Sequence, residues 1–223
     1  MRFHDRRQAG QALAGELRAL RDGGGLPEPI VVLALPRGGA AVAREVAREL
    51  DAPLDVLVVR KIGAPFHEEY GIGAIAGDDE PLFDHRALAG LGLDEADLAA
   101  TVTRERAEVR RREQRYRQGR PAPELHGRTV IVVDDGLATG STARAALRAL
   151  RRRQPGRLVL AVPVGAPDSV ELMRAEADEV LCLYAPAAFT AVGLWYEEFD
   201  QLTDDDVLRA LHTGRTVPGG PGG

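Results

Sequence analysis

Apolar residues follow two patterns along the chain, and together they predict alternating strands and helices. Short continuous apolar runs are typical of strands covered on both faces. Five segments at 30–35, 54–59, 129–133, 158–164 and 180–183 are interpreted as such strands, and they are apolar except for Asp55, Thr129 and Pro163. Helical spacing of apolar residues occurs at 5–21, 40–50, 141–153, 167–175 and 204–211. Short turns between these segments imply right-handed parallel crossovers, so we predict an α/β fold with an open, mostly parallel five-stranded sheet and helices on both faces.

The segments between these elements predict decorations of a single domain that covers residues 1–216. Residues 60–77 are rich in glycine and polar residues and read as a mobile segment, with short strands at 72–76 and 81–84. A long polar helix at 94–118 belongs to an insertion at about 78–120. An aromatic segment at about 184–200, called the hood below, follows the last strand, and the Pro/Gly tail 217–223 is expected to be disordered.

Composition narrows the class of protein. The chain is 44% hydrophobic and 28% charged, as in globular proteins, and no apolar run approaches membrane-spanning length. A net charge of −5 argues against a general nucleic-acid binder, and the eight Arg and three Glu of residues 101–120 predict a solvated helix. Cys182 stands alone in an apolar run and is expected to be a core residue. We therefore expect a cytoplasmic protein without nucleic-acid or membrane partners.

The most informative motif lies at residues 130–142. An apolar strand ends at Asp134 and Asp135, a small-residue turn follows, and a helix begins at Ser141. Small residues let backbone N–H groups approach a phosphate, and a helix start adds free donors. The carboxylates can accept hydrogen bonds from ribose hydroxyls. A P-loop is excluded because no lysine stands between Gly140 and the hydroxyl residue. The motif therefore predicts a sugar-phosphate site.

Three loops, 36–39, 60–70 and 134–142, should meet at the carboxyl ends of the parallel strands, where open α/β sheets bind ligands. The middle loop begins with Arg60 and Lys61. Of 29 basic residues, Lys61 is the only lysine. Two interpretations of this single lysine stay open. It is there by chance, or the position needs a compact ammonium group that can contact a pyrophosphate oxygen. The five histidines show no ligand spacing, so no protein-built metal site is predicted.

These motifs resemble those of the type I phosphoribosyltransferases over most of residues 30–200. Residues 35–39 match the pyrophosphate loop, and Arg60-Lys61 matches the basic pair before the flexible catalytic loop. Asp134-Asp135 match the acids that hold the ribose hydroxyls, and 138–142 match the 5′-phosphate cradle. A bacterial group of such proteins is more similar still, through Leu-Pro-Arg-Gly-Gly at 35–39, Val-Arg-Lys-Ile-Gly-Ala-Pro at 59–65 and Val-Gly-Leu-Trp-Tyr-Glu-Glu-Phe at 192–199.

The resemblance implies transfer of the phosphoribosyl group from phosphoribosyl pyrophosphate (PRPP) to a small-molecule acceptor. It implies Mg²⁺ bound mainly through PRPP and water, and a homodimer is expected from the fold family. The catalytic residues would be Lys61, Asp134 and Asp135. The substrate-binding residues would be Arg37, Gly38, Gly39, Arg60, Ala138, Thr139, Gly140, Ser141, Thr142 and Trp195.

The acceptor and the retention of turnover stay open at this point. Ala138 stands where family members acting on 6-oxopurines carry an acid, which weakens that assignment and leaves a nucleobase or another nitrogen nucleophile. Glu69 is either a general base or a solvated loop acid. Trp195 either stacks on the acceptor or belongs to an apolar cluster that holds the hood. The alternative functions are a PRPP-sensing regulatory protein without turnover and a hydrolase that uses water.

Overall fold

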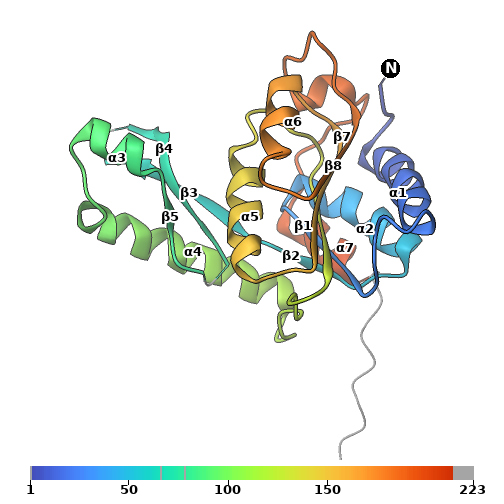
Figure 1. Ribbon diagram of the computed structural model, residues 1–223, viewed down its shortest axis with the longest axis horizontal. Helices are drawn as coiled ribbons and strands as arrows, with labels where there is room; N and C mark the ends of the chain where they lie inside the picture. Colours follow the sequence, from blue (N-terminus) through green and yellow to red (C-terminus); the bar gives the residue numbers. More distant parts are fainter. Residues whose placement is uncertain (1, 66, 78, 213–223) are drawn as a thin grey trace, which may run out of the picture.

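A parallel sheet of five strands forms the centre of the molecule (Figure 1). The computed structural model describes residues 2–65, 67–77 and 79–212, without the side chains of 67–70. The spatial order of the strands is β2 (Leu54–Val56), β1 (Ile30–Ala34), β6 (Thr129–Val133), β7 (Arg157–Val164) and β8 (Glu179–Tyr184). All neighbouring strands pair in parallel. The predicted α/β fold with an open five-stranded sheet is confirmed.

Helices cover both faces of the sheet. Successive side chains of a strand point to opposite faces, and every residue of β1 and β6 is buried, so both faces must be covered. Val32 points into one apolar core and Val31 into the other. The first core includes residues of α1 (Arg6–Asp22), α2 (Gly38–Leu50) and α7 (Asp204–His212). The second includes residues of α5 (Ser141–Arg152) and α6 (Pro167–Met173).

Local capping chemistry sets several helix boundaries. The side chain of Asp5 accepts a hydrogen bond from the N–H of Gln8 at 2.7 Å and so begins α1. Pro167 occupies the first turn of α6, where its missing N–H costs nothing. Gly92 ends α3 (His85–Leu91) with a φ of 66°, a left-handed conformation that favours glycine. The helices α1, α2, α5, α6 and α7 start and end within about two residues of their predicted bounds. The helix predicted at 94–118 begins five residues later, at Ala99, and α3 lies where no helix was predicted.

The order of the strands creates a crevice at one edge of the sheet. From β1 the chain passes through α2 to β2, and from β6 it passes through α5 to β7 on the opposite side. Because β1 and β6 are neighbours, the two connections diverge at their carboxyl ends. Such a switch point is where open α/β sheets bind ligands. The loops at 35–38 and 134–140 therefore border the expected binding crevice.

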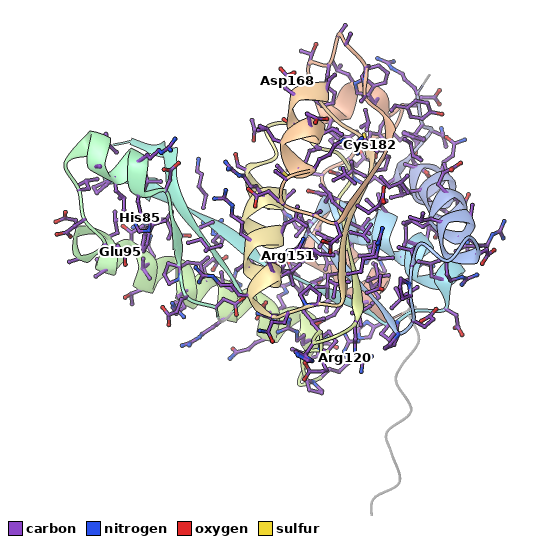
Figure 2. The ribbon with its side chains drawn as sticks, in the orientation of Figure 1. His85, Glu95, Arg120, Arg151, Asp168 and Cys182 are labelled. Atoms are coloured by element: carbon purple, nitrogen blue, oxygen red, sulfur yellow. The ribbon has the colours of Figure 1, made fainter. Side chains whose placement is uncertain are left out.

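A second, antiparallel sheet projects from the first, and Figure 1 shows it extending away from the central sheet. It contains β3 (Val59–Ala64), β4 (His67–Ala76) and β5 (Leu82–Phe83). With α3, the 3-10 helix Ala96–Leu98 and α4 (Ala99–Arg117), these strands form what we call the arm. At its tip His85 lies 3.9 Å from Glu95 (Figure 2). The insertion predicted at about 78–120 lies within this arm, which begins at Val59.

The arm corrects two predictions. Residues 54–59 are not one strand, because β2 ends at Val56 and β3 begins at Val59. Residues 60–77, for which only a short strand at 72–76 was predicted, instead form most of the hairpin of β3 and β4. Glycines caused the error, because they are poor strand residues in general. Here they permit close packing: a Cβ on Gly73 would lie 2.7 Å from the carbonyl oxygen of Leu82.

Several charged side chains of the arginine-rich helix α4 form ion pairs within the molecule. Glu108 pairs with Arg111 and Arg112 at the predicted spacings. Glu105 and Glu113, in contrast, are buried rather than solvated, which corrects the prediction of a fully solvated helix. None of the helices in the described ranges is long and apolar enough to cross a membrane.

Candidate active site

Asp134 and Asp135 follow directly after β6, at the point where the two connections diverge. The Oδ1 atom of Asp134 accepts a hydrogen bond from the backbone N–H of Asp135 at 2.8 Å. Burial, followed by the negative charge of Asp135, raises the pKa of Asp134 well above its usual range. A positive charge beside the two acids would relieve their repulsion.

Gly38 and Gly39 begin α2 against these acids and leave no room for side chains. A Cβ on Gly38 would lie 2.0 Å from Oδ2 and 2.4 Å from Cγ of Asp135. A Cβ on Gly39 would lie 2.9 Å from Cα of Asp134. The structure therefore brings these two predicted residues together with both acids. The glycines are required here by close approach, not by unusual backbone angles.

The predicted phosphate cradle occupies the turn between the acids and α5. Leu137 fixes this turn to the sheet edge: its N–H donates to the carbonyl of Val164 at 2.9 Å, and its carbonyl accepts from the N–H of Ala166 at 2.8 Å. Gly140 precedes α5 with a φ of 73°. The first N–H groups of α5 have no acceptor within the helix. Four predicted cradle residues are exposed beside them, Ala138, Thr139, Ser141 and Thr142.

The three predicted cations lie in different places. Arg37 is exposed directly before α2, next in sequence to Gly38, and the peptide bond that precedes it is cis. Arg60 donates from Nε to Oε2 of Glu105 at 2.8 Å and is thus an ion pair between β3 and α4. Lys61 is exposed on β3, where a Cβ on Gly71 would lie 2.9 Å from its Cδ atom. Arg60 and Lys61 border a cavity of about 370 Å³ in the arm.

The hood reaches the acid pair through Tyr196, whose Oη donates to the carbonyl oxygen of Asp135 at 2.6 Å. Burial raises the pKa of the Tyr196 phenol, so it stays a donor. Trp195 is half-buried beside the apolar cluster of Phe3 and Tyr196. Among the described residues its Nε1 atom is buried without a hydrogen-bond partner, and its ring borders a cavity of about 520 Å³. Packing against this cluster accounts for the buried side of Trp195. Stacking of its ring on an acceptor stays a prediction.

Sequence reasoning missed Arg6, which forms an ion pair with Asp135. Its Nε atom lies 2.8 Å from Oδ2 of that acid, and both side chains are largely buried, at 10% and 15% exposed. One signal was available: Arg6 stands in the first turn of a helix, where a positive charge is unfavourable. A cation at such a position implies a compensating partner, although the sequence does not say which acid provides it.

Three remaining predictions concern residues away from this centre. The side chain of Glu69 and the tail 217–223 lie outside the described residues. Cys182 lies in β8 (Figure 2), where burial raises the pKa of its thiol to about 11. A thiol with that pKa is a poor nucleophile at neutral pH. This agrees with the interpretation of Cys182 as a packing residue.

Comparisons with known proteins agree with this geometry. Residues 4–197 match the family described as the phosphoribosyl transferase domain. Two curated relatives from strains of Mycobacterium tuberculosis carry the provisional name phosphoribosyl transferase and are 46% identical over 209 residues, covering 94% of this chain. The chain spans 46% of their length, about half. The crystal structure of TT1426 from Thermus thermophilus is 44% identical, with a TM-score of 0.84 and coverage of 97% of this chain and 100% of that one.

Proposed function

The chain belongs to the phosphoribosyl transferase domain family, and on that premise we propose that it transfers the 5-phosphoribosyl group of PRPP to a nucleobase or another nitrogen nucleophile. One observation carries the proposal. Two adjacent carboxylates lie at the switch point of the sheet, with Gly38 and Gly39 against them and the exposed hydroxyl turn beside them. This arrangement offers oxygen acceptors for a ribose next to donors for a phosphate.

The 5′-phosphate would bind at the turn before α5. A single helix start contributes only about 1–2 kcal/mol to anion binding. Tight binding therefore needs several donors together: the hydroxyls of Thr139, Ser141 and Thr142 and the N–H groups of the first turn. Gly140 supports this because its left-handed backbone turns the chain into the helix without a side chain.

The pyrophosphate group would face Arg37 and the N–H of Gly38, since the N–H of Gly39 already donates to the carbonyl of Leu35 at 3.1 Å. These donors belong to the loop that the glycines hold against the acids. Lys61 would add a compact positive charge from β3 if the arm approaches the site. Arg60 contributes less to this proposal than the sequence predicted, because its Nε atom already donates to Glu105.

The residues at the acid pair fit a PRPP-bound Mg²⁺. Carboxylate oxygens are the ligands Mg²⁺ prefers, and the repulsion between Asp134 and Asp135, which contributes to the raised pKa of Asp134, supports a cation beside the pair. The described residues hold no cluster of three or more His, Cys, Asp or Glu side chains placed to ligate a metal. The ion would thus take most of its ligands from PRPP and water, and it would neutralise charge on the pyrophosphate.

The reaction breaks the bond between the anomeric carbon and the pyrophosphate oxygen and forms a bond from that carbon to the acceptor nitrogen. The electron pair of the broken bond leaves with pyrophosphate, and the acceptor nitrogen loses its proton to solvent or a base. The carbon becomes cationic between the two events. Asp134 and Asp135 would stabilise that charge, because a fixed negative group is worth more in a partly buried site than in water.

The test combines PRPP binding with pyrophosphate release. PRPP with Mg²⁺ should raise the melting temperature of the protein, and Asp135→Asn should remove most of that shift. The control is Asp22→Asn, since Asp22 is an exposed acid paired with Arg21 at the far end of α1. A melting curve of the unchanged protein that does not respond to saturating PRPP would refute the site.

A pyrophosphate-release screen over purines, pyrimidines and small amines then separates the alternatives. Release that depends on one acceptor identifies the transferase and its substrate. Release at the same rate without any acceptor supports the hydrolase. Retained binding without release supports a PRPP-sensing protein.

A further inference from the structure

Arg6 connects three parts of the molecule that are distant in sequence. Its Nε atom donates to Oδ2 of Asp135 at 2.8 Å, and Nη1 donates to the carbonyl oxygen of Asp200 at 2.9 Å. Its guanidinium carbon lies 3.8 Å from the centre of the Phe199 ring. One side chain on α1 thus binds an acid after β6 and the end of the hood. A lysine could not make these contacts together, because it lacks the planar fork of donors.

Asp135 is held from several directions, and Arg6 provides one of them. Its carboxylate fills the space that a side chain on Gly38 would need, at 2.0 Å from that Cβ position. Its carbonyl oxygen accepts the Tyr196 hydroxyl at 2.6 Å. Its N–H donates to Asp134. The ion pair with Arg6 therefore orients the carboxylate of Asp135. The bonds to Tyr196 and Asp134 hold the backbone of Asp135, and Gly38 packs against the side of the carboxylate.

The hood is attached to the same helix start by backbone pairing. The N–H of Phe3 donates to the carbonyl of Trp195 at 2.8 Å, and the N–H of Glu197 donates to the carbonyl of Phe3 at 2.9 Å. The N–H of Glu198 donates to the carbonyl of His4 at 2.8 Å. Residues 3–6 therefore bind the hood through the backbone and the acid pair through Arg6. Movement of one side of this connection would be transmitted to the other.

We propose that Arg6 is a positioning residue that fixes the Asp135 carboxylate at the ribose site and ties the hood to the acid pair. This inference rests on the proposed function, because it assigns Arg6 a task in the same reaction. Arg6 does not contact the ribose; it acts through Asp135.

The test compares Arg6→Met and Arg6→Lys with the control Arg7→Met. Arg7 is the next residue of α1, carries the same charge and is exposed. Arg6→Lys keeps the charge and guards against a methionine variant that fails to fold. Trp195 is the only tryptophan of the chain, so its quenching by acrylamide reports on the hood without any need for activity. Turnover is measured per PRPP-binding site, which corrects for unfolded protein.

The expected result has two parts. Acrylamide quenching of Trp195 rises in Arg6→Met but not in Arg7→Met. In Arg6→Met kcat falls by about 10²-fold, the cost of misplacing a catalytic group by about 1 Å, while KM for PRPP changes much less. Arg6→Lys recovers part of kcat. A purely structural role would lower the number of binding sites without this division between kcat and KM.

The outcomes separate the inference from the proposed function. If the unchanged protein neither binds PRPP nor releases pyrophosphate, the proposed function fails, and with it the catalytic part of the inference. The quenching comparison still tests the connection between Arg6 and the hood. If the unchanged protein turns over and Arg6→Met matches Arg7→Met in kcat, or exceeds it, the inference is overturned and the function stands. Equal quenching in these two variants overturns the connection to the hood.

Discussion

Replacing Gly38 by alanine adds one methyl group at the tightest place in the candidate site. The new Cβ would lie 2.0 Å from Oδ2 of Asp135, whereas real Cβ contacts are essentially never shorter than 3.0 Å. The carboxylate must therefore move by at least about 1 Å, against the ion pair with Arg6 that holds it at 2.8 Å. Such overpacking costs about 1–3 kcal/mol of stability. The same movement should lower kcat/KM for PRPP by about 10²-fold.

The assay pairs thermal and urea unfolding with PRPP binding and turnover, and Gly15→Ala is the matched control. Gly15 lies within α1 with nothing inside 4 Å of its Cβ position, so alanine there should stabilise the protein by about 0.5–1 kcal/mol and leave PRPP binding unchanged. Gly38→Ala should instead lower the melting temperature by about 2–4 °C for each kcal/mol lost. If Gly38→Ala binds and turns over PRPP as Gly15→Ala does, the close contact does not position the acid, and the reasoning is refuted.

Three further predictions concern the arm, α4 and β8. Lys61→Arg should lower kcat, measured by pyrophosphate release, by about tenfold, while PRPP binding, measured by calorimetry, falls less. Equal losses of kcat and of binding would show that the ammonium group has no special role. Native Cys182 should react with a thiol reagent far more slowly than in urea, because its pKa is about 11 and only the thiolate reacts; equal rates would contradict its burial. Hydrogen bonds from Arg111 and Arg112 lower the pKa of Glu108 to about 2, so its contribution to stability is present above about pH 4.5 and is lost as pH falls towards 2. Glu108→Gln should therefore flatten that part of the pH profile of unfolding by less than about 1 kcal/mol, and an unchanged profile would argue against the pairing.

The central sheet could be predicted because its strands are covered on both faces. Apart from Thr129, the run at 129–133 is entirely apolar, and β6 begins and ends at those residues. The arm could not be predicted in the same way. Its strands pack glycines against Lys61 and Leu82, and a glycine chosen for close approach looks the same in sequence as one chosen for flexibility. Only the partner strand shows which reason applies.

The candidate site divides along a similar line. Asp134, Asp135, Gly38 and the turn before α5 follow directly from strand ends, and parallel pairing brings such ends together. Arg60 was placed at the site from its neighbours in sequence, yet its partner Glu105 lies 45 residues away on α4. Arg6 lies 129 residues from Asp135. Contacts of this kind depend on how helices lie over the sheet, which no local pattern specifies.

The connection between residues 3–6 and residues 195–200 also bears on how the domain is made. Arg6 is synthesised 194 residues before Asp200, whose carbonyl oxygen it binds. On the ribosome, the sheet strands and their helices can therefore assemble while the start of α1 still lacks its final partners. Asp135 acquires its full set of contacts only after the polypeptide beyond the hood has emerged. Completion of the candidate site is in this way a late event of translation.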